Sequence, residues 1–211
     1  MIIKEFCAEN FTNIPQAIQR GARRIELCDN LTVGGTSVSL GVLTETISYC
    51  HELEVSVMTI IRPRGGDFFY NDTELKMMEI DILEAKKVGA DGVVIGCLTE
   101  DQSEIDIEGM DQLLAHTEGL QVTFHMAFDS LPKEEQFNAI DWLVERGVER
   151  ILTHGGPAGT PIQENFEHLK ALIAHADGRI IILPGGGITT QNAQEVMDTL
   201  GVKEVHGTKI V

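Results

Sequence analysis

Basic side chains are scarce in this sequence of 211 residues, which holds 16 lysine and arginine residues against 33 aspartate and glutamate residues, a formal net charge of −17. Proteins that bind nucleic acid need a dense basic face, because neutralising phosphates releases the counterions that drive binding. Close basic runs are few and short, as at Arg23-Arg24 and Arg62-Pro63-Arg64. We therefore expect no nucleic-acid partner.

Long apolar runs and close cysteine pairs are also missing. No stretch approaches the roughly 20 apolar residues of a membrane span, and the start, MIIKEFCAEN, does not have the pattern of a secretory signal. The four cysteines, Cys7, Cys28, Cys50 and Cys97, form no C-x-x-C pair of the kind found in structural zinc sites. We expect no membrane partner, reduced thiols and a cytoplasmic location, with any metal site assembled from distant segments.

What the sequence does contain is a regular alternation of short β-rich runs and longer helical patterns. The pattern predicts eight strands and seven helices. The strands are expected at 2–7, 24–28, 55–62, 92–97, 120–125, 150–153, 179–183 and 203–206, and the helices at 14–21, 40–53, 74–89, 107–117, 133–147, 164–176 and 190–200.

This alternation favours an α/β fold in a single domain, 1–211, namely a parallel TIM (β/α)8-type barrel whose last helix is missing or replaced. Several predicted helices end in a glycine that leads directly into the next strand, as at Gly21, Gly89, Gly147 and Gly201. A doubly wound open sheet is the alternative. The first strand-to-helix turn, residues 8–11, lacks the glycine fingerprint of a dinucleotide fold, which disfavours that alternative.

The missing eighth helix predicts an assembly. Only residues 207–211 follow the last predicted strand, too few for a helix that covers the first and last strands. Apolar strand surface left in water is unfavourable by roughly 25 cal/mol per Å², and such patches usually mark interfaces. We therefore expect a homodimer, with Ile2, Val205 and the C-terminus among the candidate contacts.

Polar residues at the ends of the first two predicted strands mark a candidate site, because TIM barrels place their sites at the carboxyl ends of the strands. The first strand carries Glu5 and Cys7 on one face, and the second carries Glu26 and Cys28 in the same spacing. The cysteines could be metal ligands or small core residues. The glutamates need partners if they face the barrel interior, since an unpaired buried charge is costly.

Later strands supply cationic and acid–base groups. Arg62 and Arg64 follow the third strand and could pair with one of the glutamates or hold an anionic ligand. His125 ends the fifth strand, and Asp129, four residues later, could orient it as an acid–base pair. His154 follows the sixth strand as another imidazole.

The loops after the last two strands resemble phosphate-binding turns. Gly185, Gly186 and Gly187 precede a predicted helix, and His206 begins the loop that ends at Lys209. Backbone N–H groups in such loops often hold phosphate in TIM barrels. The same glycines could also form only a tight turn.

These motifs together resemble the CutC family, named for copper homeostasis. The resemblance rests on four segments: I-I-R-P-R-G-G-D-F-F-Y at 60–70, R-I-E-L-C at 24–28, T-F-H at 123–125 with A-F-D at 127–129, and E-V-H at 204–206. It covers essentially the whole chain. Two departures are Met126, where the family usually has arginine, and His154, where it usually has serine.

The resemblance implies a cytoplasmic TIM barrel with a proposed Cu(I)-binding role in copper trafficking or tolerance. The cysteines considered as copper ligands in that family fall on Cys7 and Cys28. The family's inward polar cluster falls on Glu5, Glu26, Arg62, Arg64, His125 and Asp129.

Two functions therefore stand. The leading one is a Cu(I)-binding protein, because Cu(I) prefers thiolate ligands. The alternative is a TIM-barrel enzyme that acts on a small anionic or sugar-like metabolite, with the glutamates, His125 and Asp129 as acids and bases, an arginine on the anion and the Gly185–Gly187 loop on a phosphate.

Overall fold

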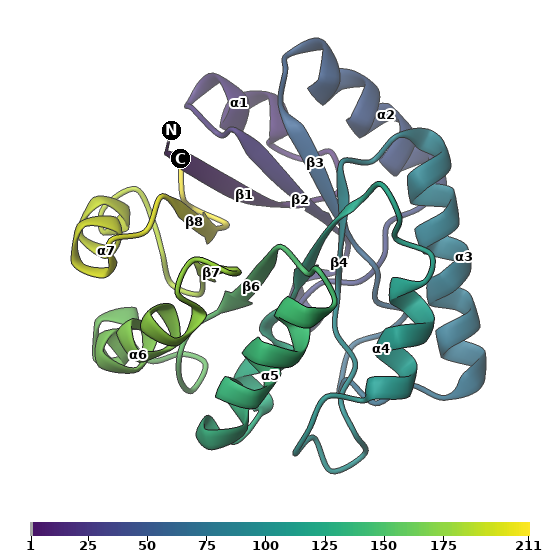
Figure 1. Ribbon diagram of the computed structural model, residues 1–211. Helices are drawn as coiled ribbons and strands as arrows, with labels where there is room; N and C mark the ends of the chain where they lie inside the picture. The colour runs from purple at the N-terminus through teal and green to yellow at the C-terminus, as the bar shows by residue number, and fades with distance from the viewer. Residues whose placement is uncertain (1) are drawn as a thin grey trace.

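The computed structural model describes residues 2–211 and forms an eight-stranded, nearly closed α/β barrel (Figure 1). The strand order is β7-β6-β5-β4-β3-β2-β1-β8, and every pair is parallel. The TIM-type barrel predicted from the alternation is confirmed. The strands are β1 (Ile3–Glu9), β2 (Arg24–Cys28), β3 (Ser56–Ile60), β4 (Gly92–Ile95), β5 (Gln121–Phe124), β6 (Arg150–Thr153), β7 (Ile181–Pro184) and β8 (Glu204–Gly207).

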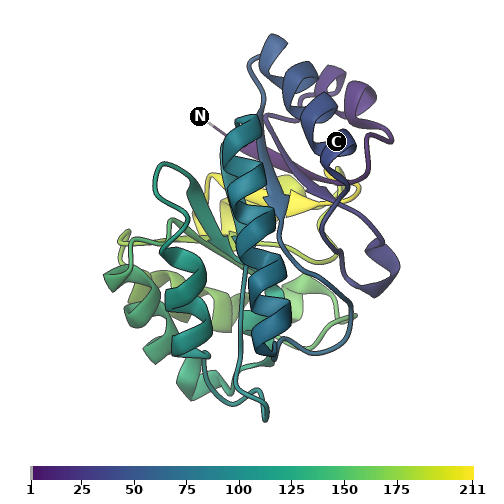
Figure 2. The ribbon, with the colours of Figure 1, turned by 90° about the vertical axis from the view of Figure 1, so that its right-hand side faces the viewer.

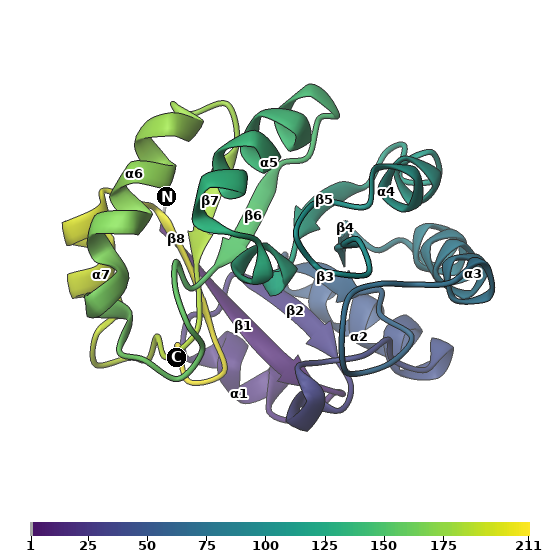
Figure 3. The same cartoon turned by 90° about the horizontal axis from the view of Figure 1, so that it is seen from below.

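Seven α-helices alternate with these strands within residues 2–211 and surround the barrel, as the view from below shows (Figure 3). They are α1 (Ile14–Gln19), α2 (Leu40–Glu52), α3 (Asp72–Val88), α4 (Ile107–Leu114), α5 (Lys133–Glu145), α6 (Phe166–Ala176) and α7 (Ala193–Leu200). None of the helices in the described part of the chain has the length and apolarity needed to span a membrane.

Helix α3 illustrates how local sequence sets these elements. Asn71 and Glu74 form a capping box that satisfies N–H groups at its start. Gly89 ends it with a φ of 90°, a left-handed conformation that strains residues with a Cβ. Figure 2 shows α3 lying across the outer face of the strands, where its residues Met78 and Ile82 are fully buried.

Most of the apolar core lies between the strands and the helices. A second, smaller cluster comprises Cys7, Cys28, Met58, Ile60 and Val94. Four of these five side chains belong to β1, β2 and β3, where alternation directs them to the same face as the polar strand residues. The cysteines therefore lie beside the polar cluster described below, apart from the main apolar core.

The C-terminal segment corrects the basis of the dimer prediction. Val205 is fully buried, and so is Ile210 in the tail that follows β8, whereas Ile2 is half exposed. The short tail thus buries an apolar side chain of its own, and Val205 cannot serve as a contact. Among the predicted contacts Ile2 is exposed, and further exposed apolar side chains lie on α3, at Met77, Ile80 and Leu83. A homodimer stays a prediction, which light scattering at low micromolar concentration tests.

Candidate functional site

Three buried polar side chains from neighbouring strands converge inside the barrel: Cys7 on β1, Glu26 on β2 and His206 on β8. One donor atom from each lies within 4.8 Å of the other two. The parallel register explains the convergence, since Cys7 lies opposite Glu26, and Glu5 on the same face of β1 lies opposite His206. This group has the geometry of a metal-ligand set.

Glu5 has two buried partners below this group. Its carboxylate is paired with the guanidinium of Arg24, and its Oε1 lies 2.8 Å from Nδ1 of His206. Arg24 also reaches Oε2 of Glu204 at 2.7 Å. Burial alone would raise the pKa of Glu5, but the charge of Arg24 and the contacts with His206 lower it to about 2. Glu5 is therefore an anion that orients His206.

The expectation that Arg62 or Arg64 pairs with a glutamate of this cluster is wrong, because Arg24 takes that role. Arg24 could have been found in the sequence, since it shares a strand face with Glu26 and Cys28 by simple alternation.

Proton affinities differ sharply between the two cysteines. Hydrogen bonding with Cys28 lowers the pKa of Cys7 well below its usual value, against the effect of burial and with help from His206. The same hydrogen bond, together with burial, raises the pKa of Cys28. The thiolate is therefore favoured at Cys7 rather than at Cys28.

Glu26 and His206 complete this electrostatic group. Burial and the charge of Cys7 raise the pKa of Glu26 well above its usual value. Burial lowers the pKa of His206, but the charge of Glu26 and hydrogen bonds to Cys7 and Glu5 outweigh it and raise that pKa. An imidazolium beside a thiolate is the arrangement that keeps a cysteine nucleophilic and able to bind metal.

The group opens onto a cavity of about 430 Å³. The cavity brings together eight of the residues singled out from the sequence: Cys7, Glu26, Cys28, Arg62, His125, Gly186, Gly187 and His206. Met126 and Lys209 also line it. Glu5, Arg64, Asp129 and Gly185 are not among the lining residues.

His125 faces this cavity as a neutral imidazole. Its Nδ1 accepts a hydrogen bond from the backbone N–H of Ala127 at 3.2 Å, so the ring proton is on Nε2. Burial and the charge of Arg62 lower the pKa of His125 to about 3. Within residues 2–211 its Nε2 has no hydrogen-bond partner although it is buried. Gly96 makes room for the ring, since a Cβ there would lie 2.6 Å from Cε1.

The predicted acid–base pair of His125 and Asp129 does not form. The Asp129 carboxylate instead accepts hydrogen bonds from the Thr153 hydroxyl and from the backbone N–H groups of His154, at 2.8 Å, and Gly155, at 3.1 Å. Thr153, at the end of β6, and the loop that follows supply these three donors, and they hold the carboxylate in place. Asp129, in the segment after β5, therefore has a structural role in joining that segment to the loop after β6.

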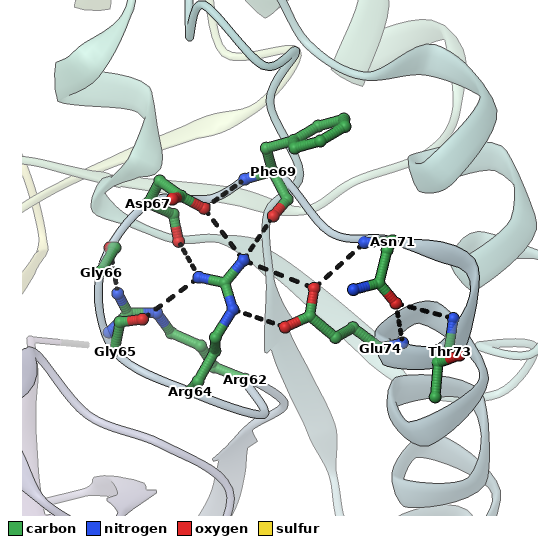
Figure 4. A network of polar contacts seen from close by, with 9 residues as sticks. All are labelled: Arg62, Arg64, Gly65, Gly66, Asp67, Phe69, Asn71, Thr73 and Glu74. Carbon is green, nitrogen blue, oxygen red and sulfur yellow. Dashed lines mark hydrogen bonds and ion pairs between the residues drawn. The ribbon is translucent and has the colours of Figure 1, made fainter.

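The two arginines of the Arg62-Pro63-Arg64 run organise loops (Figure 4). Nη1 of Arg62 donates to the carbonyl oxygens of Val33, at 2.8 Å, and Gly35, at 3.0 Å, and its Nη2 donates to that of Gly66 at 2.8 Å. These contacts occupy the end of the guanidinium, which nevertheless lines the cavity.

Arg64 points into the same loop rather than into the cavity (Figure 4). Its guanidinium pairs with Asp67 at 3.0 Å and with Glu74, the residue that caps α3. Arg64 therefore fixes the loop between β3 and α3, and the geometry gives it no ligand to hold.

The three glycines of the loop after β7 differ in whether they line the cavity. Gly186 and Gly187, with φ values of 79° and 74°, line the cavity. Gly185 lies behind them, because a Cβ there would be 2.6 Å from Leu152 Cδ1, and its carbonyl oxygen lies 3.1 Å from Nδ1 of His154. Only two of the three predicted glycines can therefore contact a ligand.

The sequence has close relatives that carry a common name. The model of the CutC family matches residues 2–211. A CutC family protein of Enterococcus faecalis is 70% identical over 210 residues, covering 100% of both chains. A human protein named copper homeostasis protein cutC homolog is 42% identical over 204 residues, covering 97% of this chain and 72% of its own.

Solved structures agree with this. The crystal structure of a CutC protein from Streptococcus agalactiae is 50% identical and superposes with a TM-score of 0.96 over 100% of both chains. An aldolase named QR15 is 18% identical, with a TM-score of 0.68 over 97% of this chain and 89% of its own, a likeness of fold alone. From its sequence, its fold and its relatives, this chain belongs to the CutC family.

Proposed function

We propose that this protein binds Cu(I) through Cys7 and Cys28 and serves copper trafficking or tolerance in the cytoplasm. The observation that carries the proposal is the pair of buried, free cysteines on the adjacent strands β1 and β2, both of which line one cavity. Cu(I) is a soft ion that prefers sulfur ligands. The name of the human relative, copper homeostasis protein cutC homolog, supports a role in the same process.

The donor set fits Cu(I) better than a harder ion. Two sulfurs are available for the metal, and His206 lies within reach of Cys7 as a third, borderline ligand once its imidazolium has released a proton. Glu26 is the only oxygen donor of the three-residue group, and burial and the Cys7 charge raise its pKa. A site for Mg²⁺ or Ca²⁺ would need several ionised oxygen ligands.

The test is an anaerobic titration with Cu(I) in competition with bathocuproine disulfonate. We expect tight binding by the parent protein and loss of that binding in the variant Cys7→Ser/Cys28→Ser. Cys50→Ala is the matched control, because Cys50 is a buried cysteine of α2 that does not line the cavity. Equal Cu(I) affinity in the double variant and the parent would refute the proposed site.

The enzymatic alternative is not supported by this geometry. It relied on an acid–base pair of His125 and Asp129, and Asp129 is bound to the loop after β6 instead. It also relied on an arginine that binds the anion directly, whereas the terminal N–H groups of Arg62 donate to loop carbonyl oxygens, which leaves only its charge to act at a distance, and Arg64 is paired with carboxylates.

A further inference from the structure

The cavity in front of Cys7 and Cys28 is much larger than a copper ion requires. Its volume of about 430 Å³ lies in the range of sites for small organic molecules, which are usually about 300–1,000 Å³. A water molecule occupies about 30 Å³ in the liquid. A site that held only a metal ion between two sulfurs would leave most of this space without a function.

The charges that line the cavity favour an anion. Arg62 and Lys209 are the basic residues of the lining, and Glu26 is its only carboxylate. This is the reverse of the whole chain, whose formal net charge is −17. A free cation gains nothing from two positive charges on its route, whereas an anion is attracted by them.

His125 adds a directional requirement. Its Nε2–H is a buried donor without a partner in the described part of the chain, and the ring lines the same cavity. A buried donor left unsatisfied is costly, so a ligand that supplies an acceptor oxygen there gains affinity. A carboxylate offers both the acceptor and the negative charge.

We propose that copper reaches Cys7 and Cys28 as an anionic Cu(I) complex of a small thiol that carries a carboxylate, and that the cavity binds this complex. The inference rests on the proposed Cu(I) site. In the exchange, the Cu–S bonds to two molecules of the small thiol break, two Cu–S bonds to the cysteines form, and two thiolates leave. Any protons on the cysteine thiols pass to the released thiolates, and copper stays Cu(I) throughout. Lys209 and His125 hold the carboxylate while the sulfurs exchange.

The experiment compares three Cu(I) donors that differ in charge: the complexes of 3-mercaptopropionate, 2-mercaptoethanol and cysteamine. Anaerobic stopped-flow absorbance of the copper–thiolate band gives the rate of transfer to the whole protein. We expect transfer to be fastest from 3-mercaptopropionate and slowest from cysteamine, with the extremes at least about tenfold apart at low ionic strength. Added salt should reduce the difference.

Two variants separate the cavity from the overall charge. Lys209→Gln should bring the 3-mercaptopropionate and 2-mercaptoethanol rates closer together. Lys76→Gln, on the exposed surface of α3, makes the same change in net charge outside the cavity lining and should leave their ratio unchanged.

Equal rates from the three donors, with copper still bound by Cys7 and Cys28, would overturn this inference and leave the proposed function intact. A charge preference that falls equally in Lys76→Gln and Lys209→Gln would also overturn it, because the whole surface would then be responsible. Failure to take Cu(I) from any donor would refute the proposed function together with the inference.

Discussion

Replacing Arg24 with methionine tests how the interior of the barrel is held together. The Arg24 side chain is 3% exposed and pairs with Glu5, also 3% exposed, and with Glu204 at 2.7 Å. Removing one partner of a buried ion pair leaves an uncompensated charge and costs about 3–5 kcal/mol. For a chain of this size each kcal/mol lowers the melting temperature by about 2–4 °C, so we expect a decrease of roughly 6–20 °C.

The assay is urea unfolding followed by far-UV circular dichroism, with thermal melts alongside. The double variant Arg24→Met/Glu5→Gln should recover part of the loss, since the stranded carboxylate is then neutral. Lys87→Met is the surface control, because Lys87 is 73% exposed and lies 3.4 Å from Glu84, and its loss should change the free energy of unfolding by less than about 0.5 kcal/mol. A loss below about 1 kcal/mol in Arg24→Met, with no recovery in the double variant, would refute the reasoning.

Three further predictions follow from the same geometry. The pKa of Glu5 falls from 4.5 to about 2 on folding, so the ionised group stabilises the protein above pH 4.5, and this contribution is lost as the pH falls toward 2. Between pH 4.5 and 2 the free energy of urea unfolding should therefore depend less steeply on pH in Glu5→Gln than in the parent, by up to about 1.4 kcal/mol per pH unit. Gly96→Ala places a Cβ 2.6 Å from the His125 ring and should destabilise the protein by about 1–3 kcal/mol, measured by the same unfolding assay, and unchanged stability would mean that the ring lies elsewhere. Arg62→Lys cannot bind the carbonyl oxygens of Val33, Gly35 and Gly66 together, so amide hydrogen exchange should increase in both loops, and unchanged exchange there would contradict the contacts described.

Much of the fold could be read from the sequence because it depends on local periodicity. All eight strands and seven helices predicted within the described residues are present, and the differences lie at their ends. The third strand was expected to run to residue 62 and ends at Ile60, since the next residues turn into the loop that Arg62 and Arg64 organise. Element ends depend on such contacts with other segments, which periodicity does not report.

The candidate site, too, could be predicted from the sequence only where it depends on local periodicity. Alternation along two strands was enough to place Glu5 with Cys7 and Glu26 with Cys28 on shared faces, and the register of β1 and β2 brings those faces together. The predicted pairing of His125 with Asp129 failed because a separation of four residues does not fix the direction in which the Asp129 side chain points. Asp129 instead accepts hydrogen bonds from donors at the end of β6 and in the loop after it, which lie 24 to 26 residues away along the chain.

The sequence by itself therefore determined the order of the elements, the faces of the strands and the residue types available for the proposed copper site. Only the tertiary structure decided which charged side chains pair with each other. Arg24 reaches Glu204 across 180 positions of sequence, and His206 reaches Glu5 across 201. Those contacts exist because the barrel brings the last strand against the first, and buried charges then select the nearest partner able to offset their desolvation. No local sequence pattern specifies contacts between residues so far apart along the chain.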